Sequence, residues 1–223
     1  MINRVLCDLD GTLVDTMDLI LASFHHAFEQ GLGETVTDQE LLVYFGQTLE
    51  DQFGRMRPHL SSEDIARVVD IYREHNHREH DARVFLVPGA DQALEKLHRE
   101  GYDLGVVTSK RLDLAQHGLE LFGLWQYFSV VVHEASTRQH KPHPAPILRA
   151  LEEWHVSSDH VVYVGDSPYD MMAAKAAGCV GLGLAYNTFS VEDLIKAGAD
   201  TVHTTWDSAV AWIMAQREES KKA

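Results

Sequence analysis

Two aspartates near the start of the sequence, Asp8 and Asp10, follow the apolar run 5–7 and are separated by one residue. The run predicts a short buried strand, and Gly11 with Thr12 predicts the turn that ends it. Residues i and i+2 of an extended chain point to the same side, so both carboxylates would enter one pocket. Two ionised carboxylates repel, and the pair therefore predicts a bound cation or a shared proton. A simple aspartate-rich turn is the alternative.

Hydroxyl and ammonium groups follow apolar segments later in the chain. Thr108 and Ser109 come directly after the segment 104–107, and a hydroxyl there could donate to a phosphate oxygen. Lys141 follows a loop and precedes Pro142, which would stiffen the backbone that carries the ammonium. Each feature also has a plain alternative, namely an ordinary polar strand end for the hydroxyls and a solvated loop residue for the lysine.

Two more acids, Asp166 and Asp170, follow the apolar segment 160–164. Asp166 stands where the chain would leave a sheet, and Asp170 lies near the start of the next helix. A helix cap and a first-turn acid are the plain alternatives. If these acids meet Asp8 and Asp10 at one sheet edge, a divalent cation must balance them. Hard oxygen ligands that handle phosphate favour Mg²⁺.

The elements that would position these residues alternate between strands and helices. Strands are predicted at 104–107, 128–132, 160–164, 180–184 and 201–203, with helices at 90–99, 112–122, 145–154, 168–177, 191–197 and 206–217. This order predicts an α/β fold, a Rossmann-like doubly wound parallel sheet with helices on both faces. Residues 1–15 and 84–223 would form this core. Residues 16–83 show only helical patterns and predict an all-helical cap, or lid, inserted after the first strand.

The order of these motifs resembles the haloacid dehalogenase superfamily of phosphohydrolases. The resemblance is carried by Asp8-Leu9-Asp10-Gly11-Thr12, Thr108, Lys141-Pro142 and Gly165-Asp166-Ser167-Pro168-Tyr169-Asp170. It implies that Asp8 is the nucleophile, that Asp10 is the general acid and base, and that Thr108 holds the transferring phosphoryl group. Lys141 would balance charge.

The same resemblance implies a Mg²⁺ site and part of a substrate site. The ion would be held by the side chains of Asp8 and Asp166 and the backbone carbonyl of Asp10, with Asp170 in support. Ser109 stands where the family often has asparagine. Gly11, Thr12 and Ser109 are expected to contact substrate.

The cap carries the residues expected to select the substrate. Arg73, Asn76, His77 and His80 have i, i+3, i+4, i+7 spacing and share one helix face. A solvated polar face or an accidental metal-binding tract is the alternative. The spelling of this stretch resembles the PpaX-type inorganic pyrophosphatases of bacteria, in the phosphoglycolate-phosphatase-like branch. Gln47, in the loop 45–48, is expected to contact substrate as well.

Composition limits the partners of the chain. A formal net charge of −15 argues against binding nucleic acid or an anionic membrane. Two cysteines and an N-terminus that enters a strand directly, without a signal peptide, favour a reduced cytoplasmic protein. We expect a monomer or a weak homodimer.

The reaction expected from these residues is Mg²⁺-dependent phosphate hydrolysis through an aspartyl-phosphate, with inorganic pyrophosphate as the substrate. A phosphoglycolate phosphatase or a general phosphatase of small phosphomonoesters is the alternative. A sugar-phosphate mutase would need a cationic sugar-phosphate contact where Leu49 stands, which disfavours it. A non-catalytic regulatory protein would not need all of the motif residues.

Overall fold

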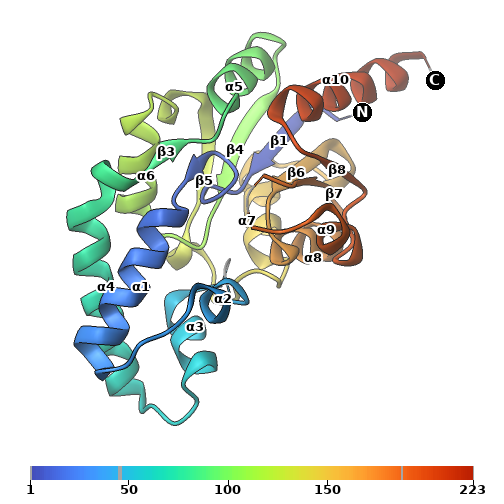
Figure 1. Ribbon diagram of the computed structural model, residues 1–223. Coiled ribbons are helices and arrows are strands. Elements are labelled where there is room, and N and C mark those ends of the chain that lie inside the picture. Colours follow the sequence, from blue (N-terminus) through green and yellow to red (C-terminus); the bar gives the residue numbers. More distant parts are fainter. Residues whose placement is uncertain (1, 45–46, 187, 223) are drawn as a thin grey trace.

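A six-stranded parallel sheet forms the centre of the computed structural model, which describes residues 2–44, 47–186 and 188–222 (Figure 1). The strand order is β5 (Phe128–Val132), β4 (Asp103–Val107), β1 (Arg4–Cys7), β6 (Val161–Gly165), β7 (Val180–Leu184) and β8 (Thr201–His203). The chain starts in the middle of the sheet, adds β4 and β5 on one side, and then adds the other three strands. This reversal beside β1 is where open α/β sheets bind ligands.

Helices cover both faces of the sheet, which confirms the predicted doubly wound fold. One face packs against α5 (Ala90–Arg99), α6 (Leu112–Leu121) and α10 (Trp206–Lys222). The other packs against α7 (Ala145–Trp154), α8 (Pro168–Ala177) and α9 (Val191–Lys196). Successive residues of β1 alternate between the two cores, since Val5 and Cys7 enter the first and Leu6 the second.

Four helices, α1 (Met17–Leu32), α2 (Asp38–Leu42), α3 (Leu49–Met56) and α4 (Ser62–Arg83), come between β1 and the rest of the sheet. The long helices α1 and α4 lie side by side (Figure 1). Together with α3 they form a separate apolar cluster that includes Phe24, Phe28, Phe53 and Tyr72. These helices correspond to the expected cap; that residues 16–83 act as a separate moving domain stays a prediction.

A two-stranded antiparallel ribbon joins this helical part to the sheet and was not expected from the sequence. It pairs β2 (Val14–Asp15) with β3 (Phe85–Leu86). Each strand has two residues, which is too short for an alternating pattern to be visible. Among the described residues, no helix is both long enough and apolar enough to cross a membrane.

Side-chain caps begin several helices. Thr37 accepts a hydrogen bond from the backbone N–H of Glu40 and opens α2 with a capping box, as its sequence indicates. The helix ends at Leu42. Gly46 and Phe45 lie outside the described residues.

The aromatic cluster of the cap gives a test of its stability. Phe53 is fully buried and contacts the rings of Phe24, Phe28 and Tyr72. We expect Phe53→Ala to lower the free energy of unfolding by about 3–5 kcal/mol, because it leaves a cavity. Phe85→Ala is the matched control, since Phe85 is 62% exposed, and should change it by at most about 0.5 kcal/mol. Equal losses in urea titrations of the two variants would contradict this packing.

Candidate active site

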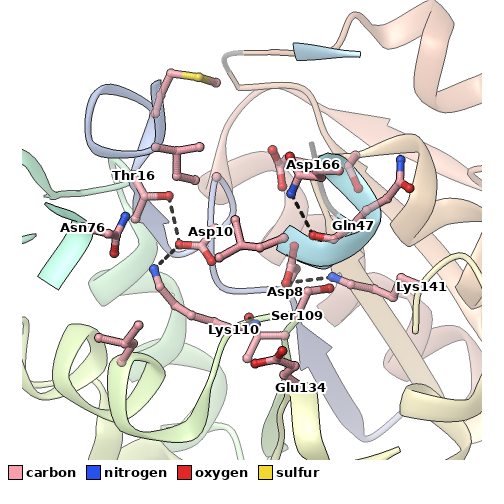
Figure 2. A pocket seen from close by; sticks show the side chains of 18 of the residues that line it. Asp8, Asp10, Thr16, Gln47, Asn76, Ser109, Lys110, Glu134, Lys141 and Asp166 are labelled. Carbon is pink, nitrogen blue, oxygen red and sulfur yellow. Dashed lines mark hydrogen bonds and ion pairs between the residues drawn. The ribbon is translucent and has the colours of Figure 1, made fainter. Parts of the chain in front are cut away.

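Three neighbouring strands bring the predicted core residues to one edge of the sheet. Asp8 follows β1, Thr108 follows β4 and Asp166 follows β6. Since β1 lies between β4 and β6 and all three are parallel, their carboxyl ends adjoin. All three residues line one cavity between this edge and the cap helices. Figure 2 shows that cavity with the carboxylates of Asp8 and Asp10.

Lys141 is buried against two of the acids. Its ammonium lies 2.8 Å from Asp8 Oδ1 and 2.7 Å from Asp170 Oδ1. The same nitrogen lies 3.3 Å from the hydroxyl of Tyr163, which is itself 3.0 Å from Asp170 Oδ1. Burial opposes the charge on Lys141, yet the carboxylates of Asp170 and Asp8 raise its pKa above the ordinary lysine value. The alternative of a solvated loop lysine is therefore wrong.

The pKa values of Asp8 and Asp166 are raised because both acids are buried close to other carboxylates. Burial, together with Asp170, raises the pKa of Asp8 to about 7, although Lys141 acts in the opposite direction. Burial and the same two carboxylates, Asp170 and Asp8, raise the pKa of Asp166 well above its ordinary value. A cation near these side chains would favour their ionised forms.

The three acids suit a hard divalent cation, but they are not equally free to bind it directly. One ligand atom from each of Asp8, Asp166 and Asp170 lies within 4.8 Å of the others. Carboxylate oxygens at such a spacing are the ligands that Mg²⁺ takes. Both oxygens of Asp170 already have protein partners, since Oδ1 contacts Lys141 and Oδ2 accepts from the backbone N–H and hydroxyl of Ser167. The geometry therefore suits Asp170 for support and Asp8 with Asp166 for direct ligation.

Asp10 also reaches the cavity, but it has its own partners. Its Oδ1 accepts from the hydroxyl of Thr16 at 2.9 Å and lies 2.6 Å from the ammonium of Lys110 (Figure 2). Because β1 ends at Cys7, the chain has already turned at Asp10, which separates its carboxylate from the contacts of Asp8. Sequence reasoning missed Lys110; its place directly after Thr108 and Ser109 was the available signal.

The turn residues Gly11 and Thr12 hold Asp166 in place. Thr12 donates to Asp166 Oδ1 at 3.0 Å. It is fully buried and does not line the cavity, so the expectation that it contacts substrate is corrected: it positions an acid instead. Gly11 has φ +80°, and a Cβ there would meet the Asp166 carboxyl carbon at 2.7 Å. Only glycine satisfies both conditions.

The two hydroxyl residues after β4, Thr108 and Ser109, both line the cavity. The hydroxyl of Thr108 accepts from the backbone N–H of Lys110 at 3.1 Å, which turns the loop and directs Lys110 toward Asp10. Thr108 is 4% exposed, so its side chain has a fixed place at the strand end.

The cap contributes fewer donors to the cavity than the sequence suggested. Arg73 and Asn76 line it, whereas His77 is exposed and His80 is buried elsewhere. The four positions span about 100° of the helix circumference and about 10 Å of its axis, which is more than one small cavity covers. The predicted donor set of four is therefore corrected to Arg73 and Asn76.

His80 lies where α4 meets α6. Its Nδ1 is 2.9 Å from Asp81 Oδ1, and the same oxygen is 2.7 Å from Nε2 of His117 on α6. Burial lowers the pKa of His80. Its contacts are those of a residue that joins two helices.

Two cap residues contact the sheet side of the cavity. Gln47 donates to the hydroxyl of Tyr169 at 2.6 Å and lines the cavity, while its contact with substrate stays a prediction. Arg73 lies 3.0 Å from Glu50 of α3 and 3.4 Å from Glu134, which follows β5. Cap and core therefore meet through polar contacts around the cavity.

Known proteins share both the sequence pattern and the fold. The sequence profile of the haloacid dehalogenase-like hydrolases matches residues 5–183. The pyrophosphatase PpaX of Bacillus pumilus (strain SAFR-032) is 36% identical over 199 residues, which cover 89% of this chain and 90% of that protein.

Solved structures of predicted phosphatases have a similar fold. The crystal structure of a predicted phosphatase from Clostridium acetobutylicum has a TM-score of 0.87 at 27% identity, covering 96% of this chain and 99% of its own. That of a predicted phosphoglycolate phosphatase from Haemophilus somnus 129PT has a TM-score of 0.85 at 25% identity, covering 94% and 97%.

The close approach of β6 to Asp170 yields a prediction. A Cβ at Gly165 would meet Asp170 Oδ2 at 2.7 Å, so Gly165→Ala must displace the carboxylate that holds Lys141. We expect kcat/KM for phenyl phosphate to fall about tenfold or more, because small misplacements at a reacting centre are costly. In Gly181→Ala the new Cβ would meet its nearest neighbour at 3.5 Å, and activity should be kept. Full activity of Gly165→Ala would show that Asp170 does not position Lys141.

Proposed function

This chain belongs to the haloacid dehalogenase-like hydrolase family, and we propose that it uses the site described above to hydrolyse inorganic pyrophosphate. Its relatives and structural neighbours make it a phosphatase of that family. The observation that carries the proposal is the pairing of buried Lys141 with Asp8, because it holds a carboxylate and a cation together where a phosphoryl group would be attacked.

The first half of the proposed reaction forms an aspartyl-phosphate. A carboxylate oxygen of Asp8 attacks one phosphorus atom, and the bond between that phosphorus and the bridging oxygen breaks. The electron pair of that bond leaves with the second phosphate, which takes a proton from Asp10. Lys141 and the hydroxyl of Thr108 stabilise charge on the transferring oxygens.

The second half returns the enzyme to its starting state. Asp10, now a carboxylate, takes a proton from a water molecule that attacks the phosphorus of the aspartyl-phosphate. The bond from phosphorus to the Asp8 oxygen breaks, which releases phosphate and restores the Asp8 carboxylate. Each turnover therefore consumes one water and yields two phosphates, and Asp10 gives and regains one proton.

The proposed metal ion is Mg²⁺, held by the side chains of Asp8 and Asp166 and the backbone carbonyl of Asp10. When bound, it would neutralise phosphoryl oxygens and ease the approach of one anion to another. Thr12 and Gly11 fix the Asp166 carboxylate, and Asp170 fixes Lys141. Neighbouring residues of the chain thus orient both a proposed metal ligand, Asp166, and the cationic side chain of Lys141.

The proposed preference for pyrophosphate over other small phosphates rests on donors in the cavity wall. Arg73, Asn76 and Lys110 line the cavity and can all donate hydrogen bonds. Pyrophosphate has no carbon skeleton and must be recognised by such donors. Phosphoglycolate is the second candidate, since its carboxylate could use the same donors and a structural neighbour carries that predicted activity. A mutase is disfavoured because Leu49 gives the cavity an apolar contact.

The nucleophile can be tested directly. Asp8→Asn should lower turnover more than about a thousandfold, because an amide does not attack phosphorus. The exposed variant Asp159→Asn should keep wild-type activity. Acid quenching of the wild type during turnover, followed by peptide mass spectrometry, should find a phosphoryl group on the peptide that contains Asp8. Turnover by Asp8→Asn at the wild-type rate would refute the mechanism.

The substrate and the metal are tested by one panel of assays. With Mg²⁺, we expect kcat/KM to be highest for pyrophosphate, then 2-phosphoglycolate, then phenyl phosphate. A chelator should abolish all three activities, and added Mg²⁺ should restore them, since the acids need a cation to stay ionised together. A higher kcat/KM for 2-phosphoglycolate would move the assignment to that substrate, and activity in excess chelator would refute the metal.

A further inference from the structure

We propose that Lys110 binds the leaving group of the substrate and makes the enzyme selective for leaving groups that carry a negative charge of their own. The inference rests on the proposed hydrolytic function, and it gives a specific role to a residue that the sequence analysis left without one. In the structure Lys110 contacts Asp10, and on substrate binding it would exchange that carboxylate for a phosphate or carboxylate of the leaving group.

Lys110 lies on the side of the cavity where the leaving group of the substrate is expected. Asp8 faces Lys141, whereas Asp10 faces Thr16 and Lys110 (Figure 2). If Asp10 protonates the leaving oxygen, the group beyond that oxygen must lie next to Asp10. An ammonium 2.6 Å from Asp10 Oδ1 is then within reach of the leaving group.

The two cavity lysines differ in how firmly they are held. The Lys141 side chain is 2% exposed and contacts two carboxylates and a tyrosine hydroxyl. The Lys110 side chain is 12% exposed and extends from a loop to the single carboxylate of Asp10. A flexible four-carbon side chain at the cavity wall can change partners at little cost. Lys141 is thus suited to a fixed role at the reacting phosphoryl group and Lys110 to an exchangeable one.

The neighbourhood of Lys110 supports an anion site rather than a purely structural ion pair. The backbone N–H of Glu134 donates to the carbonyl of Lys110 at 3.0 Å, and Glu134 in turn contacts Arg73 of the cap. Lys110 and Arg73 both line the cavity, one from the core and one from the cap, and both are near Glu134. Each cation is paired with carboxylates, Lys110 with Asp10 and Arg73 with Glu50 and Glu134. An anionic leaving group would replace the carboxylate of Asp10 on Lys110, and charge-assisted hydrogen bonds to phosphate are strong.

The test compares substrates whose leaving groups differ in charge. Lys110→Met should lower kcat/KM for pyrophosphate and for 2-phosphoglycolate at least tenfold more than for phenyl phosphate, whose leaving group has no second anion. Lys110→Arg should recover most of the lost selectivity. Lys196→Met is the matched control, because Lys196 forms an exposed ion pair with Glu192 at 2.9 Å and lies outside the cavity, so its selectivity should stay unchanged.

A binding measurement keeps the test informative if Lys110→Met turns over too slowly to assay. In the Asp8→Asn background with Mg²⁺, calorimetry should show that Lys110→Met weakens pyrophosphate binding at least tenfold and phenyl phosphate binding much less. Equal losses for both ligands, or no loss, would overturn the proposal and leave Lys110 as a support for Asp10.

Failure of this inference can be separated from failure of the proposed function. If the wild type hydrolyses pyrophosphate and Lys110→Met affects every substrate equally, only the role of Lys110 is wrong. If the wild type does not hydrolyse pyrophosphate, the substrate assignment is wrong, and the comparison of 2-phosphoglycolate with phenyl phosphate still decides the role of Lys110.

Discussion

The buried ammonium of Lys141 is the interaction on which the site depends. It lies between the carboxylates of Asp8 and Asp170, and it opposes the rise that burial causes in the pKa of Asp8. Removing one member of a buried charge pair leaves the other uncompensated, which is costly. Tyr163 and Ser167 complete the hydrogen bonds of this cluster, so the sheet edge, the lysine loop and the start of α8 are fixed together.

Much of the core could be predicted from the sequence because its signals are local. Apolar segments of three to five residues, which precede Asp8, Thr108 and Asp166, identify both the strands and the edge where they end. The position of Lys110 directly after Thr108 and Ser109 could have placed it at this edge, but the contacts that Thr12 and Lys110 make could not be obtained in this way. Thr12 contacts an acid 154 positions away, and Lys110 contacts one 100 positions away, and no local pattern records such a pairing.

In the cap, the helices could be predicted from the sequence, but the surroundings of their polar side chains could not. Its helices were predictable from their periodicity and capping residues, but the direction of each polar side chain was not. A shared helix face suggested four donors, and the structure brings only Arg73 and Asn76 of those four to the cavity. The burial of His80 against α6 depends on how α4 docks, which is a tertiary property. Helical spacing establishes which residues are neighbours on a helix; it does not establish what the helix faces.

The central place of β1 has a consequence for how the chain folds. Arg4 pairs with Asp103 on one side and with Val161 on the other. Both strands that flank β1 are therefore synthesised long after it. During synthesis Asp8, the proposed nucleophile, emerges long before Lys141, Asp166 and the residues that hold them. Parallel pairing over such distances is slow and leaves an apolar strand unpaired meanwhile. The cap helices, whose contacts are mostly among themselves, can form first and keep the early part of the chain compact until the rest arrives.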